Sequence, residues 1–168
     1  MKSHGNCRSA GGYALMAALL TVFAVSLAAS VAVRRAYQEQ QRERELELLF
    51  VGQQYREALG SFAAVQRPGG QGEYPKMLDD LVLDKRGPSI VRHLRRIYPD
   101  PMTGKADWLL DTVQGRIVGV HSRSDKAPIR TAGFPDGLDG FAIASSYRDW
   151  RFLAKGIAAA PGAATADH

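Results

Sequence analysis

The chain has few of the residues from which most catalytic and metal sites are built. Its 168 residues include a single cysteine, Cys7, so no disulfide can form within the chain. If the residues before the apolar stretch are removed by cleavage, the chain has no thiol, and a cysteine-ligated metal site is excluded. A lipoprotein site at Cys7 is excluded too, because the apolar stretch follows this cysteine instead of preceding it. The sequence has no HExxH pattern and no Gly-x-Ser-x-Gly nucleophile elbow. These absences predict a protein that is not an enzyme.

The positive net charge is modest. It amounts to +5, and Lys2 and Arg8 contribute two of these charges, which leaves +3 on the rest of the chain. No group of lysines and arginines is interleaved with aromatic residues, as it is in many nucleic-acid-binding surfaces. We therefore expect a mildly basic, solvated surface and no nucleic-acid partner.

One long stretch carries no charge at all. Residues 11–33 read GGYALMAALLTVFAVSLAASVAV, which is 23 consecutive uncharged residues. As a helix with a rise of about 1.5 Å per residue, this stretch reaches roughly 35 Å, enough to cross the hydrocarbon core of a bilayer. Backbone groups in lipid need partners within the segment, so a helix is the state that we expect. A cleaved secretory signal with its cut near Ala28-Ala29-Ser30 is the alternative, although its apolar region is usually only about 7–15 residues long.

The residues just before this helix resemble a known processing site. A short leader containing Lys2 and Arg8 ends in Gly11-Gly12, and Tyr13 and the apolar helix follow. This pattern resembles the class III signal of type IV pilins and of the pseudopilins of type II secretion. The resemblance implies that a prepilin peptidase cuts between Gly12 and Tyr13 and that Tyr13 becomes the N-methylated first residue. The helix would then stay in place as a membrane anchor.

One position departs from the family pattern. The fifth residue after the cut is usually a glutamate in this family, and here it is Ala17. A carboxylate inside the bilayer is costly and needs a partner, which in the family is thought to be the amine at the first residue of a neighbouring subunit. Ala17 removes both the cost and the pairing. The resemblance therefore implies a minor or tip subunit, and not the major subunit of a filament.

The helical pattern continues beyond the apolar stretch. Residues 34–47 contain no glycine or proline, and oppositely charged residues such as Arg42 and Glu45 stand at spacings that allow surface pairs. Residues 43–58 also resemble the stalk of a subgroup of pseudopilin-like secretion proteins. Apolar residues then recur at spacings of 3, 4, 4 and 3, which predicts a helix face packed on a head: Leu48, Val51, Tyr55, Leu59 and Phe62. We expect one continuous helix of about 50 residues.

The rest of the chain predicts a small head, and the fold class expected is α+β. A long N-terminal helix would pack on short helices and an antiparallel sheet, as in pilin-like proteins. The expected divisions are 1–12 prepilin-type leader, 13–33 transmembrane helix, 34–65 amphipathic stalk helix, 66–75 loop, 76–154 periplasmic α+β head and 155–168 disordered tail.

Two short helices are expected in the first half of the head. One begins at Pro75 or Lys76 and ends at Val82. The other covers residues 88–97, with a buried face formed by Ile90, Val91 and Leu94. Its opposite face carries three arginines that are either solvated or turned toward an acidic partner or lipid headgroups: Arg92, Arg95 and Arg96.

The second half of the head predicts strands. Two apolar segments, 108–110 and 116–121, flank a Gln114-Gly115 turn, as the strands of an antiparallel hairpin do. Residues 150–153 alternate in polarity and predict an edge strand. The order of these elements also resembles the pseudopilin subgroup named above.

The polar residues of the head form no recognisable catalytic pattern. His121 and Ser122 stand at a strand end, with Asp100, Asp107 and Asp111 in the same half of the chain, but this spacing does not establish the geometry of a triad. Candidate calcium ligands stand in and before the segment FPDGLDG: Asp125, Asp136 and Asp139. Calcium needs several converging oxygens, so the alternative is a polar turn.

The resemblance implies a pseudopilin-like subunit of a type II secretion-like periplasmic filament, which acts mechanically in protein export across the outer membrane. Expected partners are membrane lipid, the prepilin peptidase, other pseudopilins and inner-membrane secretion components, and no cofactor is expected. The chain would cross the bacterial inner membrane once, with its N-terminus in the cytoplasm and its head in the periplasm. Two alternatives stay open: a minor pilin of a type IV pilus or competence filament, and a signal-anchored periplasmic binding protein.

Overall fold

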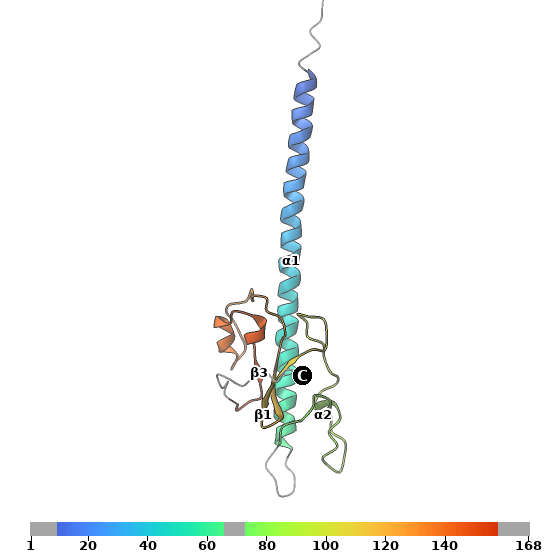
Figure 1. The fold of residues 1–168 in the computed structure, drawn as a ribbon, viewed down its shortest axis with the longest axis vertical. Coiled ribbons are helices and arrows are strands. Elements are labelled where there is room, and N and C mark those ends of the chain that lie inside the picture. The colour runs from blue at the N-terminus through green and yellow to red at the C-terminus, as the bar shows by residue number, and fades with distance from the viewer. Residues whose placement is uncertain (1–9, 66–72, 158–168) are drawn as a thin grey trace, which may run out of the picture. The chain divides into compact units, whose positions relative to one another are not determined.

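The computed structural model describes residues 10–65 and 73–157 (Figure 1). Most of the expected leader, most of the expected 66–75 loop and most of the expected tail lie outside the described residues. The chain divides into two compact units, Met1–Gln41 and Arg42–His168. The division falls inside the predicted stalk.

A single helix, α1, covers Ala10–Ala64. Its 55 residues confirm the predicted continuous helix, although it begins inside the expected leader and not at Tyr13. The part of α1 in the first unit exposes apolar side chains, whereas the part in the second unit is covered by the head (Figure 1). The predicted face is confirmed, because all five of its apolar residues are buried: Leu48, Val51, Tyr55, Leu59 and Phe62.

A three-stranded antiparallel sheet packs on this part of α1, so the fold class is α+β. Its strands are β1 (Leu109–Val113), β2 (Arg116–His121) and β3 (Phe152–Leu153), in the order β1-β2-β3. Gln114 and Gly115 both have positive φ, at 51° and 71°, as a tight hairpin turn requires. The predicted hairpin and the predicted last strand are confirmed.

Aromatic side chains fill the space between the sheet, α1 and two short 3-10 helices, η1 (Asp139–Ile143) and η2 (Tyr147–Asp149). The rings of Phe141 and Trp150 stack at 5.3 Å between centroids, and Phe152 meets Phe141 edge-on at 5.2 Å. Each large side chain buried in this way stabilises the fold by about 1.5–3 kcal/mol. The core of the head therefore includes the C-terminal part of α1.

The first short helix of the head is shorter than predicted. Only α2 (Asp79–Val82) is helical. The carboxylate of Asp80 accepts hydrogen bonds from the backbone N–H groups of Lys76 and Met77, both at 3.1 Å. The N–H groups of Asp80 and Leu81 donate to carbonyls three residues back, at 3.2 and 3.1 Å, so the chain forms tight turns before α2 and the regular helix begins only at Asp79.

The predicted helix over residues 88–97 is wrong. Asp84 and Val91 instead exchange two backbone hydrogen bonds, of 2.9 and 3.1 Å, and close a loop. The N–H groups of His93 and Leu94 both donate to the carbonyl of Leu81 at 2.9 Å, which no helix over 88–97 allows. Only Leu94 of the predicted apolar face is buried, whereas Ile90 is 62% exposed.

Candidate functional site

The residues of the predicted processing site lie in one helical segment. Gly12, Tyr13 and Ala17 all belong to α1, and the Tyr13 side chain is 83% exposed. The apolar side chains that follow are exposed as well, from Leu15 to Val31. Among the described residues, α1 is the one helix long and apolar enough to cross a membrane.

The polar side chains in this apolar segment are satisfied within the helix. The hydroxyl of Thr21 donates to the carbonyl of Ala18 at 2.8 Å, and that of Ser26 donates to the carbonyl of Val22 at 2.8 Å. Ser30 repeats the pattern with the carbonyl of Ser26 at 2.9 Å. No hydroxyl of these three residues therefore needs water, which suits a helix surrounded by hydrocarbon.

A buried carboxylate lies where the second unit begins. Glu45 of α1 is only 3% exposed, and its Oε1 atom accepts hydrogen bonds from the backbone N–H groups of Ile129 and Arg130. The hydroxyl of Tyr147 donates to the same oxygen at 2.8 Å. Because Glu45 is buried, the predicted surface pair with Arg42 is wrong, and Glu45 instead fastens two distant head segments to the helix.

A second polar cluster closes around the last turns of α1. The Arg86 guanidinium contacts the Asp84 carboxylate, with Nη2 and Oδ2 2.7 Å apart, and donates to the carbonyl of Phe62 at 2.7 Å. It also lies over the Phe62 ring, 3.4 Å from its centroid. A cation beside the unpaired carbonyls at a helix C-terminus is favourable. Arg86 therefore fastens the loop that starts at Asp84 to the end of α1.

His93 completes this cluster. Its Nε2 atom lies 3.1 Å from Oδ2 of Asp84, and its Nδ1 atom lies 2.7 Å from the hydroxyl of Ser61 on α1. The hydrogen bond from Arg86 opposes the effect of burial and, with the contacts of His93, holds the pKa of Asp84 well below its usual range. The charged side chains of this cluster are paired with each other. We call Asp84, Arg86 and His93 the clamp at the end of α1, because they hold the loop after Asp84 against the helix.

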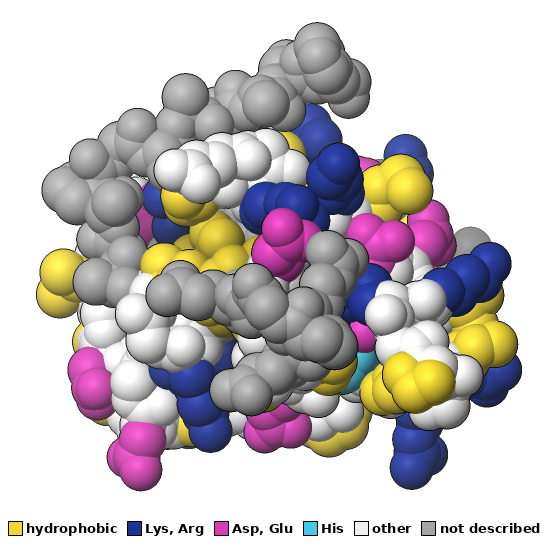
Figure 2. Space-filling view, turned by 90° about the horizontal axis from the view of Figure 1, so that it is seen from below, with side chains coloured by type: hydrophobic (Ala, Val, Ile, Leu, Met, Phe, Trp, Pro, Cys, Tyr) yellow, Lys and Arg dark blue, Asp and Glu magenta, His cyan; other side chains and the backbone are white. Residues whose placement is uncertain are grey.

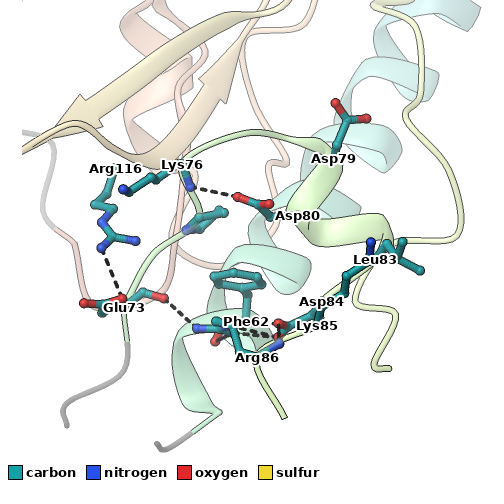
Figure 3. Close-up of a pocket in the computed structure, with 11 residues that line it drawn as sticks. Phe62, Glu73, Lys76, Asp79, Asp80, Leu83, Asp84, Lys85, Arg86 and Arg116 are labelled. Carbon is teal, nitrogen blue, oxygen red and sulfur yellow. Dashed lines mark hydrogen bonds and ion pairs between the residues drawn. The ribbon is translucent and has the colours of Figure 1, made fainter. Parts of the chain in front are cut away.

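A hollow of about 700 Å³ lies beside the cluster. Figure 3 shows Arg86 directed at Asp84 and Phe62, and Arg116 directed at Glu73 across the opening. Arg116 and Glu73 form an ion pair at 3.1 Å. Charges of both signs line the hollow and several are already paired with each other, so it presents no concentrated charge of one sign to a ligand.

The five residues weighed as a possible triad do not come together, because His121 and Ser122 contact different aspartates and Asp107 lies in a third contact. The hydroxyl of Ser122 donates to the buried Asp100 carboxylate at 2.7 Å, whereas Nδ1 of His121 lies 3.2 Å from Asp111. Ser122 is thus bound to an aspartate and not to the histidine next to it. Asp107 accepts from the hydroxyl of Thr103 at 2.6 Å.

The candidate calcium ligands are also separated by their partners. Asp125 forms an ion pair with Arg148 at 3.1 Å. The backbone carbonyl of Asp136 accepts from Arg56 at 3.3 Å, and Asp139 stands in the first turn of η1. Within residues 10–65 and 73–157, no group of three or more His, Cys, Asp or Glu side chains is placed to hold a metal ion.

The two polar clusters were missed from the sequence. Glu45 could have been found, because it precedes Leu48 by three residues and so falls on the buried face of α1. Asp84 carries a weaker signal, since it is the last acidic residue before the basic stretch that begins at Lys85. Its partnership with Arg86 and His93 depends on a loop that no local pattern predicts.

Comparisons with models of protein families, with curated proteins and with solved structures found no match to this chain.

Proposed function

We propose that the chain is a membrane-anchored, pseudopilin-like subunit of a type II secretion-like filament. The observation that carries the proposal is the junction of Gly12 and Tyr13 at the start of the uncharged stretch 11–33, in a helix that continues without a break to Ala64. A secretory signal would lose its apolar helix by cleavage on the far side of the membrane. A cut at Gly12 would keep the helix attached to the head.

The arrangement supports a mechanical function. The apolar part of α1 exposes side chains that lipid or other apolar helices can cover, and its hydroxyls need no outside partner. The head is fastened to the charged part of α1 by the Glu45 and Asp84 clusters. A displacement of this part of α1 would therefore move the head with it.

The position of Ala17 shapes the proposed role. The assembly carboxylate of the pilin-like family is absent, so this chain would enter a filament as a minor or tip subunit. Its N-terminus would lie in the cytoplasm and its head in the periplasm of a bacterial cell. The prepilin peptidase would be its processing enzyme, and other pseudopilins would be its neighbours.

The experiment that tests this proposal is N-terminal sequencing and intact-mass measurement of the membrane-bound protein, made in cells with and without a prepilin peptidase. We expect a start at N-methylated Tyr13 only when the peptidase is present. A Gly12→Leu variant should keep its leader, whereas Gly5→Leu, a matched change within the leader, should still be cut. An intact Met1 with the peptidase present, or a start near Val31, would refute the proposal; a start near Val31 would indicate a secretory signal.

A further inference from the structure

The stretch after Asp84 concentrates positive charge. From Lys85 to Tyr98 there is no aspartate or glutamate, and the side chains of four basic residues are exposed: Lys85, Arg92, Arg95 and Arg96. Among the described residues, no ion pair joins any of these four to an acidic side chain. Arg86, the fifth, is held by Asp84. Within residues 10–65 and 73–157, the exposed positive charge of this stretch is therefore not neutralised by an ion pair.

The same stretch exposes apolar surface on a firmly held loop. Ile90 is 62% exposed and Val91 is 39% exposed, between Lys85 and the arginines. The backbone pairing of Asp84 with Val91 and the contacts of Arg86 hold the loop in place. Figure 2 shows lysine and arginine side chains around exposed hydrophobic ones, on the side where Figure 1 places α2. We call Lys85, Ile90, Arg92, Arg95 and Arg96 the basic loop.

A surface of opposite charge lies on α1 within the same unit. Five of its exposed residues fall within an arc of about 100° around the helix axis and so share one face of the helix, which we call the acidic stripe: Glu43, Leu46, Glu47, Phe50 and Glu57. Leu46 is 59% exposed and Phe50 is 58% exposed. At about 100° of rotation per residue, the arginines of this part of α1 fall about 80° or more from Phe50, outside the stripe.

We propose that the basic loop of one copy docks on the acidic stripe of a second copy of this chain. Both surfaces combine exposed apolar side chains with charge of one sign, and the two signs are opposite. Arginine can bind carboxylates with two parallel hydrogen bonds, and exposed aromatic and arginine side chains are enriched where proteins associate. Both surfaces belong to the second unit, so the contact does not depend on the processing of the leader or on Ala17.

The contact joins two different surfaces, the basic loop of one copy and the acidic stripe of the other. A reciprocal second contact closes a symmetric pair, whereas a single contact leaves one basic loop and one acidic stripe of the pair free for a neighbouring subunit. Its charges are exposed, so salt weakens it at ionic strengths where the screening length falls below about 10 Å.

Cross-linking between full-length chains in membranes tests the geometry. In a Cys7→Ser background, one tagged chain carries Phe50→Cys and a second, differently tagged chain carries Ile90→Cys. We expect the mixed pair to cross-link several times more than either pair of identical chains. Ile143→Cys in place of Ile90→Cys is the matched control, since Ile143 is 91% exposed and lies outside the basic loop. Equal yields for the mixed pair and the control overturn the proposal.

Charge reversal tests the chemistry and separates it from the proposed secretion function. Arg95→Glu with Arg96→Glu in the Ile90→Cys chain, or Glu43→Arg with Glu47→Arg in the Phe50→Cys chain, should each lower the mixed cross-link by roughly tenfold, and the two pairs of changes together should restore it. Loss of the contact without restoration overturns the proposal. If the arginine changes lower the mixed cross-link in phosphatidylglycerol bilayers but not in phosphatidylcholine bilayers, while the glutamate changes alter nothing in either, a lipid surface and not a second copy is the partner. Correct processing at Tyr13 with no cross-link would leave the proposed function standing and overturn this contact alone.

Discussion

The Tyr147 hydroxyl donates a hydrogen bond of 2.8 Å to the Glu45 carboxylate, although 102 residues separate them in the sequence. Glu45 stands on α1 and Tyr147 begins η2, so this contact joins the helix to the last part of the head. The same carboxylate oxygen also accepts two backbone N–H groups. Buried polar groups of this kind are costly when one partner is removed.

Removal of this carboxylate should destabilise the head. Glu45→Ala leaves two buried N–H groups and one hydroxyl without an acceptor, so we expect a loss of about 3 kcal/mol in the free energy of unfolding. Tyr147→Phe removes a single bond to a charged group and should cost about 1.5–3 kcal/mol. Urea unfolding of the full chain in detergent measures both. Glu47→Ala, at an exposed position of the same helix turn, is the control, and an equal loss there would contradict this role of Glu45.

Two glycines of α1 should respond oppositely to alanine. A Cβ atom at Gly52 would overlap the ring of Phe152 in β3, whereas a Cβ at Gly60 would meet nothing within 4 Å. Gly52→Ala should therefore lower the free energy of unfolding by about 1–3 kcal/mol through overpacking. Gly60→Ala should raise it by about 0.5–1 kcal/mol, because alanine is the better helix former. Thermal unfolding followed by circular dichroism measures both, and a stabilising Gly52→Ala would show that β3 does not lie on α1.

The contribution of the clamp at the end of α1 to the free energy of unfolding should fall in acid. Because the pKa of Asp84 is depressed in the folded state, the unfolded chain takes up the proton first as the pH falls below about 4. The contribution of Asp84 is therefore present above this pH and is lost progressively below it. Asp84→Asn should cost about 3 kcal/mol at pH 7, because Arg86 and His93 lose a buried partner.

Urea unfolding of the parent chain and of Asp84→Asn, at pH 7 and at pH 3, measures this effect. The difference between the two proteins should shrink at pH 3. Asp79→Asn is the control, since Asp79 is an exposed aspartate beside the same hollow. A difference for Asp84→Asn that is the same at both pH values would contradict the role of its charge.

The hydroxyl of Tyr55 should lose its proton at a higher pH than that of an exposed tyrosine. Burial, opposed in part by its backbone hydrogen bond with Tyr98, raises the pKa of Tyr55 to about 12. The unfolded chain loses this proton near pH 10, so the stability due to Tyr55 is complete below that pH and is lost as the pH rises toward 12. Absorbance titration of the phenolate in the parent chain and in Tyr55→Phe should differ by one late-ionising group. A difference that appears near pH 10 in the folded protein would contradict the burial of this hydroxyl.

The sequence by itself determined the elements whose cause is local. The uncharged run from Gly11 to Val33 and the apolar spacing from Leu48 to Phe62 each depend only on helix period and length, and α1 contains both. The Gln114-Gly115 turn between two apolar segments was equally sufficient for the hairpin. The motif at Gly12 and Tyr13, on which the proposed function rests, also belongs to the sequence alone.

Only the tertiary structure decided the polar contacts and the loop over residues 84–91. Local periodicity predicted a helix at 88–97. In the structure the Asp84 carboxylate is instead paired with Arg86 and His93, and the backbone of Asp84 pairs with that of Val91, so the chain forms a closed loop. The same contacts leave Ile90 and the arginines exposed. The partners of Glu45 and Asp84 come from segments far apart in the chain or from irregular loops. A pattern with a fixed period carries no information about such neighbours, because they meet only after the head has folded on α1.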